Sequence, residues 1–165
     1  MNLDDTTIDT IAAFRKYVED SVANDDRYGA ATRCDADDGT VLATRFDAGS
    51  SCWFEVVIHV PTAQVRVGFL TTDSQVDEEL AEAIRESVGS LAAFVGEGFQ
   101  EAGLEWESPI VNHETGDGLG FSYTTPIDLD ELLELDRDEI RDKVVRMLEG
   151  YLVAFGPAVF LDEED

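Results

Sequence analysis

Apolar residues recur at intervals of three and four between Thr6 and Ala23. This spacing places them on one stripe of an α-helix, so the pattern predicts a helix over this segment. Thr6 is expected to cap the helix, because Asp9 follows three residues later in the spacing of a capping box. The predicted stripe consists of Ile8, Ile11, Phe14, Val18 and Val22.

After the turn signal Asp38-Gly39 the pattern changes to an alternation of period two, which is typical of strands. The alternation predicts three strands, over residues 40–46, 52–60 and 65–69. Because only short turns separate these strands, we expect an antiparallel meander.

The middle strand shows which side chains share a face. Its core face is predicted to carry Cys52, Phe54, Val56, Ile58 and Val60. Trp53, Glu55 and His59 then share the second face, where Glu55 is expected to pair with Arg66 of the next strand. Antiparallel sheets commonly bury one face and leave the other in water. These four residues are therefore a candidate partner-binding surface, unless a helix covers them and makes Trp53 part of the core.

From Ser74 to Val95 the helical period returns and predicts one long helix. Small residues form a second stripe along this helix and would let another backbone approach closely. This stripe consists of Ala83, Ser87, Ser90 and Phe94. Either the sheet or the second subunit of a homodimer could use it, and we expect a dimer interface there.

Two further strands and a helix complete the predicted order. The strands are expected over residues 104–110, which include Trp106, and 119–125, with a polar hairpin tip at 116–118. A short helical turn through Leu132, Leu133 and Leu135 is expected next, and then a helix that is capped by Asp136 and ends at Gly156-Pro157. The acidic tail 161–165 is expected to fray. Without repeats or linkers, residues 1–165 are predicted to form one α+β domain.

Charge is the strongest compositional signal. The chain has 37 acidic and 11 basic residues, a formal net charge of −26 spread along its whole length. Only Lys16 and Lys143 are lysines, and this balance resembles that of proteins from halophilic archaea, in which salt cations act as general counterions. We expect a cytoplasmic protein, because no stretch approaches the ~18 apolar residues of a membrane helix and no signal region precedes the first helix.

The same composition argues against several functions. Scattered bases disfavour nucleic-acid binding, although an acidic surface that mimics nucleic acid stays a minor alternative. Cys34 and Cys52 are expected to be buried small hydrophobic side chains and not a disulfide or a metal pair. Cys52 and His59 are expected to point to opposite faces of their strand. His113 is expected in a solvated loop. No metal, cofactor or catalytic motif is found, so no cofactor is predicted.

The predicted order is helix, three strands, long helix, two strands, helix. From Thr6 to Phe160 this order resembles the fold of the bacterial type III secretion chaperones and of the YbjN-like proteins. The resemblance implies a five-stranded antiparallel sheet flanked by helices, in a small, acidic and often dimeric protein that binds segments of partner proteins without catalysis. No fingerprint motif supports it.

Two functional hypotheses follow. The first is a non-enzymatic, chaperone-like domain that binds a protein partner of unknown identity. The alternative is a small-molecule-binding domain or small enzyme that uses the face of Trp53, Glu55 and His59. A ligand site requires a concave pocket with converging polar groups, whereas a partner surface is a flat or grooved apolar patch.

Overall fold

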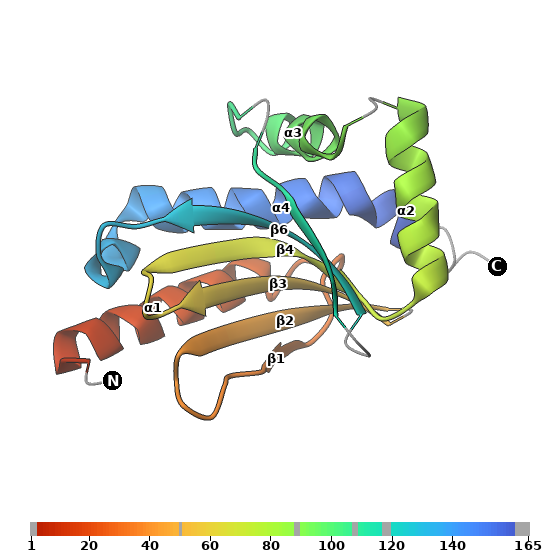
Figure 1. Ribbon diagram of the computed structural model, residues 1–165. Helices are drawn as coiled ribbons and strands as arrows, with labels where there is room; N and C mark the ends of the chain where they lie inside the picture. The colour runs from red at the N-terminus through yellow and green to blue at the C-terminus, as the bar shows by residue number, and fades with distance from the viewer. Residues whose placement is uncertain (1–2, 50, 88–89, 107–108, 117–119, 161–165) are drawn as a thin grey trace.

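One antiparallel sheet with helices packed on one face forms the protein (Figure 1). The computed structural model describes residues 3–49, 51–87, 90–106, 109–116 and 120–160. The helices are α1 (Asp5–Val22), α2 (Ser74–Ser87), α3 (Leu91–Glu101), the 3₁₀ turn η1 (Leu132–Asp136) and α4 (Asp138–Phe160). The strands are β1 (Ala31–Arg33), β2 (Val41–Gly49), β3 (Cys52–His59), β4 (Gln64–Thr71), β5 (Asn112–Gly116) and β6 (Gly120–Asp128).

The described strands lie side by side in the order β1-β2-β3-β4-β6-β5, each antiparallel to its neighbour. The three-strand meander β2-β3-β4 is confirmed, and so is the α+β fold class. The short edge strand β1 was not predicted, because a three-residue polar segment carries no alternation that sequence analysis can detect.

Helices α1 and α4 cover one face of the sheet and α3 packs on α4 (Figure 1). The predicted core face of β3 is confirmed, since these residues are no more than 5% exposed. They are Cys52, Phe54, Val56, Ile58 and Val60. Aromatic rings join the sheet to α4: the ring of Phe155 lies 5.2 Å from that of Phe69 and 5.3 Å from that of Tyr151. The core therefore lies between the sheet and α4.

The first helix begins earlier than predicted. Asp4, not Thr6, is its cap, because the Asp4 side chain accepts a hydrogen bond from the Thr7 backbone nitrogen. The stripe from Ile11 to Val22 is buried as predicted, but Ile8 is 49% exposed. The start of α1 extends beyond the ends of the strands (Figure 1).

The long helix predicted from Ser74 is wrong in one respect: it is divided into α2 and α3, which run in different directions (Figure 1). Ser90 has an extended backbone and caps α3, accepting a hydrogen bond from the Ala93 nitrogen at 3.1 Å. Ala83 therefore lies on one helix and Phe94 on the next, and the predicted small-residue stripe is not continuous. The side chain of Ser87 lies outside the described residues.

The strand predicted over 104–110 is also wrong. The described residues of this segment are not in the sheet, and the strand that pairs with β6 begins at Asn112. Leu104 and Trp106 pack against the core instead, with the Trp106 ring 5.5 Å from that of Phe99. Apolar residues alternate here because Leu104 and Trp106 are both packed against the core. From the sequence alone, this alternation cannot be distinguished from that of a strand. Residues 107–108 and 117–119, including most of the predicted hairpin tip, lie outside the described part of the chain.

The short helical turn predicted through Leu132, Leu133 and Leu135 is confirmed as η1. The last helix begins at Asp138, two residues after its predicted cap Asp136, because η1 extends to Asp136. It continues past Gly156-Pro157 to Phe160, contrary to the prediction. A proline removes only one helical hydrogen bond, and near the end of a helix that loss does not stop the chain. The predicted frayed tail, 161–165, lies outside the described residues.

Candidate ligand-binding site

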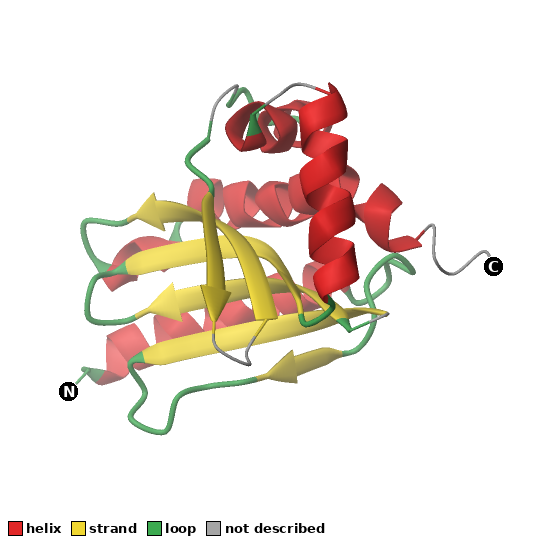
Figure 2. Ribbon diagram, turned by 45° about the vertical axis from the view of Figure 1, so that its right-hand side comes forward, coloured by secondary structure: helices red, strands yellow, loops and turns green. Residues whose placement is uncertain are grey.

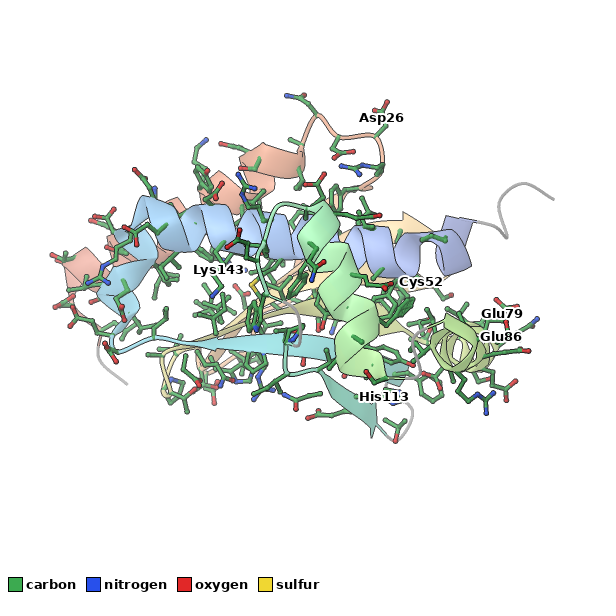
Figure 3. All side chains as sticks on the ribbon, turned by 90° about the horizontal axis from the view of Figure 1, so that it is seen from above. Asp26, Cys52, Glu79, Glu86, His113 and Lys143 are labelled. Atoms are coloured by element: carbon green, nitrogen blue, oxygen red, sulfur yellow. The ribbon has the colours of Figure 1, made fainter. Side chains whose placement is uncertain are left out.

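The face of the sheet opposite α1 and α4 is concave. No described helix covers it, and the sheet curls so that β5 lies across it (Figure 2). Viewed from above, β5 with His113 lies on the other side of the sheet from α4 (Figure 3). The curl encloses a hollow of about 220 Å³, which we call the open-face hollow.

The open-face hollow is lined by side chains from β2, β3, β4, β5 and β6 and by Cys34, the residue that follows β1. Its charged and titratable lining consists of Arg45, Glu55, His59, Arg66 and Glu114. Ser122 and Thr124 add hydroxyl groups, and Val41 and Val57 form part of an apolar floor. Polar groups from distant parts of the sequence thus converge on one concave surface, which is the arrangement expected of a ligand site.

The strand register explains why these side chains meet. Glu55 lies opposite Arg45 on one side and Gly68 on the other, while Val57 lies opposite Arg66. Three of the four residues predicted for a partner surface therefore reach the hollow. The fourth, Trp53, is half-buried on the same face but does not line it.

Glu55 is buried, at 7% exposure, although its side chain faces the hollow. Its ion pair is with Arg45, whose Nε lies 3.3 Å from Glu55 Oε2, so the predicted pair with Arg66 is wrong. The cause is register, because Arg66 lies opposite Val57 and not opposite Glu55. Burial raises the pKa of Glu55, and Arg45 offsets only part of that effect.

Arg66 is held by a neutral amide. Its Nε donates to Gln64 Oε1 at 2.7 Å, and Gln64 Nε2 donates in turn to Asp128 Oδ1 at 2.6 Å across the β4–β6 pair. Most arginines here pair with a carboxylate, but Arg66 and the exposed Arg85 have no such partner among the described residues. The Arg66 charge is thus oriented but not neutralised.

His59 contributes a neutral imidazole at neutral pH. Burial lowers its pKa from an ordinary value near 6.5, the positive charge of Arg66 lowers it further, and Glu114 opposes the shift. No described residue hydrogen-bonds to the His59 ring. Cys52 lies on the helix-covered face and contacts the Thr71 hydroxyl at 3.3 Å, so the predicted separation of Cys52 from His59 is confirmed. The predicted burial is right for Cys52 and wrong for Cys34, which is exposed because it follows the edge strand β1.

A second group of titratable side chains anchors β5. His113 lies on this strand and not in a loop as predicted; its ring stacks on Tyr123, with centroids 4.2 Å apart and planes 8° apart. Its Nε2 lies 3.1 Å from Asp77 Oδ1 on α2, and the Tyr123 hydroxyl donates to the same oxygen. Burial is the largest cause that raises the pKa of Tyr123, and the hydrogen bond to Asp77 raises it further.

This His113 clasp fixes β5 to β6 and α2, and so fixes the neighbouring Glu114 at the edge of the hollow. Sequence reasoning missed it, because its three residues come from separate elements and no local pattern links them. The only signal was the presence of two histidines in the whole chain.

Trp106 occupies a different surface. Lys143 Nζ lies 4.5 Å from the centre of its ring, a cation–π contact. Two wider hollows of about 780 and 540 Å³ border the loop at 104–106. The described polar lining of these hollows comes from the 104–106 loop with α3 or α4, whereas five strands contribute side chains to the open-face hollow, which is the stronger candidate.

Among the described residues, no group of three histidines, cysteines or acids has the arrangement of a metal site. None of the described helices combines the length and hydropathy needed to cross a membrane. Comparisons with protein-family models, curated proteins and solved structures found no match to the chain. The resemblance to the type III secretion chaperones and YbjN-like proteins therefore stays a prediction.

Proposed function

We propose that the protein is a non-enzymatic binding protein whose small polar ligand occupies the open-face hollow. The observation that carries this proposal is the oriented but unneutralised guanidinium of Arg66, facing the same concave surface as Glu55 and His59. In a chain with a net charge of −26, Arg66 and Arg85 are the arginines without a carboxylate partner among the described residues, and of these two Arg66 lines a concave surface.

Binding is favoured over catalysis by the state of the titratable groups. Glu55 is engaged by Arg45, and no described residue orients the His59 imidazole as a general base requires. The thiol of Cys34 lines the hollow but is exposed. None of these groups forms the nucleophile–base pair of covalent catalysis within the described residues.

A chaperone-like surface for a protein partner, and a homodimer through Ala83, Ser87, Ser90 and Phe94, stay predictions. The open face is concave and polar, whereas such a partner surface is expected to be a flat or grooved apolar patch. The geometry therefore gives ligand binding more support than partner binding.

We also infer that the protein works in the salt-rich cytoplasm of a halophilic archaeon. The support is the ratio of 37 acidic to 11 basic residues, which leaves most carboxylates without a basic partner. At molar salt the Debye length falls to about 3 Å, and mutual repulsion among these carboxylates is screened.

A thermal-shift screen of small polar metabolites in about 2 M KCl tests the proposed function. We expect at least one compound to raise the melting temperature of the wild type and to lose this effect in Arg66→Gln. Arg85→Gln is the matched control, because Arg85 also has no carboxylate partner among the described residues but lies on the exposed surface of α2. A screen in which no shift depends on Arg66 would refute the proposal.

A further inference from the structure

Beside the Arg45–Glu55 ion pair, the open-face hollow presents two groups of opposite charge, Arg66 and Glu114, that form no ion pair with each other. We propose, building on the function above, that its ligand is a zwitterion of the α-amino acid class. The ligand carboxylate binds Arg66, and its ammonium group binds the carboxylates of Glu114 and Glu55.

The anion-binding side of the hollow is the Arg66 guanidinium. Gln64 occupies only its Nε, and the two terminal nitrogens of the guanidinium have no partner among the described residues. A guanidinium whose terminal nitrogens are free matches the two oxygens of a carboxylate. The chain from Asp128 through Gln64 fixes its orientation.

The cation-binding side consists of two carboxylates. Glu114 is exposed at the edge of the hollow and has no ion-pair partner in the described chain. Glu55 is buried and has a single contact from Arg45 at 3.3 Å, which is long for a charge-assisted hydrogen bond. An ammonium group would supply the hydrogen bonds that Glu55 lacks, and the raised pKa of Glu55 agrees with this.

The charged side chains that line the hollow argue against a ligand that carries charge of only one sign. A plain anion near Arg66 would be repelled by Glu55 and Glu114, and a plain cation would be repelled by Arg45 and Arg66. Arg66 and Glu114 lie within electrostatic range of His59, yet they form no ion pair with each other. A ligand that carries both charges on a short framework satisfies both sides at once.

The size and floor of the hollow fit the same class. Its volume of about 220 Å³ is smaller than that of sites for drug-sized molecules, which begin at roughly 300 Å³. Val41 and Val57 give the floor an apolar patch beside the charged groups. An amino acid with a small aliphatic side chain has this combination of charge and hydrophobic surface.

Equilibrium dialysis tests the inference. The full chain, in about 2 M KCl, is dialysed against an equimolar mixture of the protein L-amino acids, and retained compounds are measured by amino-acid analysis. We expect one or a few to be retained. Arg66→Gln and Glu114→Gln should each weaken retention at least tenfold, since each removes a charge-assisted hydrogen bond to the ligand. Arg85→Gln should have no effect.

Calorimetry on the best-retained amino acid completes the test. Its N-acetyl derivative lacks the ammonium group and its methyl ester lacks the carboxylate, so both should bind at least tenfold more weakly. Equal binding of either derivative, or no retained amino acid, would overturn the inference. If the metabolite screen still showed an Arg66-dependent shift, only the ligand class would be wrong; without such a shift, the proposed function would fail too.

Discussion

The buried carboxylate of Glu55 is expected to lower the stability of the fold at neutral pH. It is 7% exposed, its only described ion pair is long, and burial raises its pKa. A raised pKa means that the folded state binds the proton more tightly than the unfolded state does. The contribution of protonated Glu55 to the free energy of unfolding is thus fully present at pH values below the pKa that Glu55 has in the unfolded state. This contribution is lost as pH rises through the higher pKa that Glu55 has in the folded state. A residue that lowers stability at neutral pH is more readily explained by binding than by folding.

Glu55→Gln removes this titration. We expect its free energy of unfolding at pH 7 to equal or exceed that of the wild type, and the wild type to lose more stability between about pH 4 and pH 7. Urea unfolding at both pH values, in molar KCl, measures this. Glu114→Gln, on the exposed edge, is the control and should change stability by less than about 0.5 kcal/mol. A Glu55→Gln variant markedly less stable at pH 7 would show that the carboxylate stabilises the fold.

The side chain of Phe155 on α4 is expected to contribute strongly to the free energy of unfolding. Phe155 is fully buried and its ring contacts those of Phe69, Tyr123 and Tyr151. Phe155→Ala should lower the free energy of unfolding by about 3–5 kcal/mol, because it leaves a cavity beneath the sheet. Ile8→Ala is the control, since Ile8 is 49% exposed, and should cost far less. Equal losses in the two variants, measured by urea unfolding, would contradict this account of the core.

Among the elements, β5 contributes most to the shape of the hollow. It is an edge strand with one neighbour in the described sheet, and the His113 clasp ties it to α2. The clasp combines an aromatic stack with two hydrogen bonds to a single Asp77 oxygen. Its loss would release Glu114 from the edge of the hollow.

His113→Ala should therefore raise amide hydrogen exchange in β5 while exchange in β3 stays unchanged. The expected loss in local stability is about 1–3 kcal/mol, the combined worth of the stack and a hydrogen bond to a charged group. Tyr123→Phe, which keeps the stack and removes only the hydroxyl contact, should have a smaller effect on β5. Uniform acceleration across the whole sheet would mean that the clasp is a global and not a local anchor.

The elements differ in how far sequence predicts them. The meander was predictable because period-two alternation over β2, β3 and β4 reports directly on one buried face. The break between α2 and α3 was not, because a hydrophobic stripe continues across the pair Gly89-Ser90, of which Ser90 caps α3. Likewise, Glu55, His59 and Arg66 could be placed on one face of the sheet, because alternate residues of a strand point to the same face. The curl that brings Glu114 to them depends on long-range packing, which no local pattern encodes.

At the scale of the whole molecule, we expect charge to determine how stability depends on salt. A net charge of −26 on 165 residues gives strong self-repulsion, which dissolved salt screens. The free energy of unfolding should therefore rise steadily between about 20 mM and about 2 M KCl, followed by circular dichroism during urea unfolding. Equal stability at both concentrations would remove the main support for a salt-adapted protein.

The most direct test of the central claim locates the bound ligand. Backbone amide NMR spectra of the full chain in molar KCl are recorded during titration with a compound identified by the metabolite screen or retained in dialysis. The account predicts that the perturbed amides gather on β3, β4 and β5 around Glu55, His59, Arg66 and Glu114. Perturbations confined to α3 and the loop at Trp106 would contradict it.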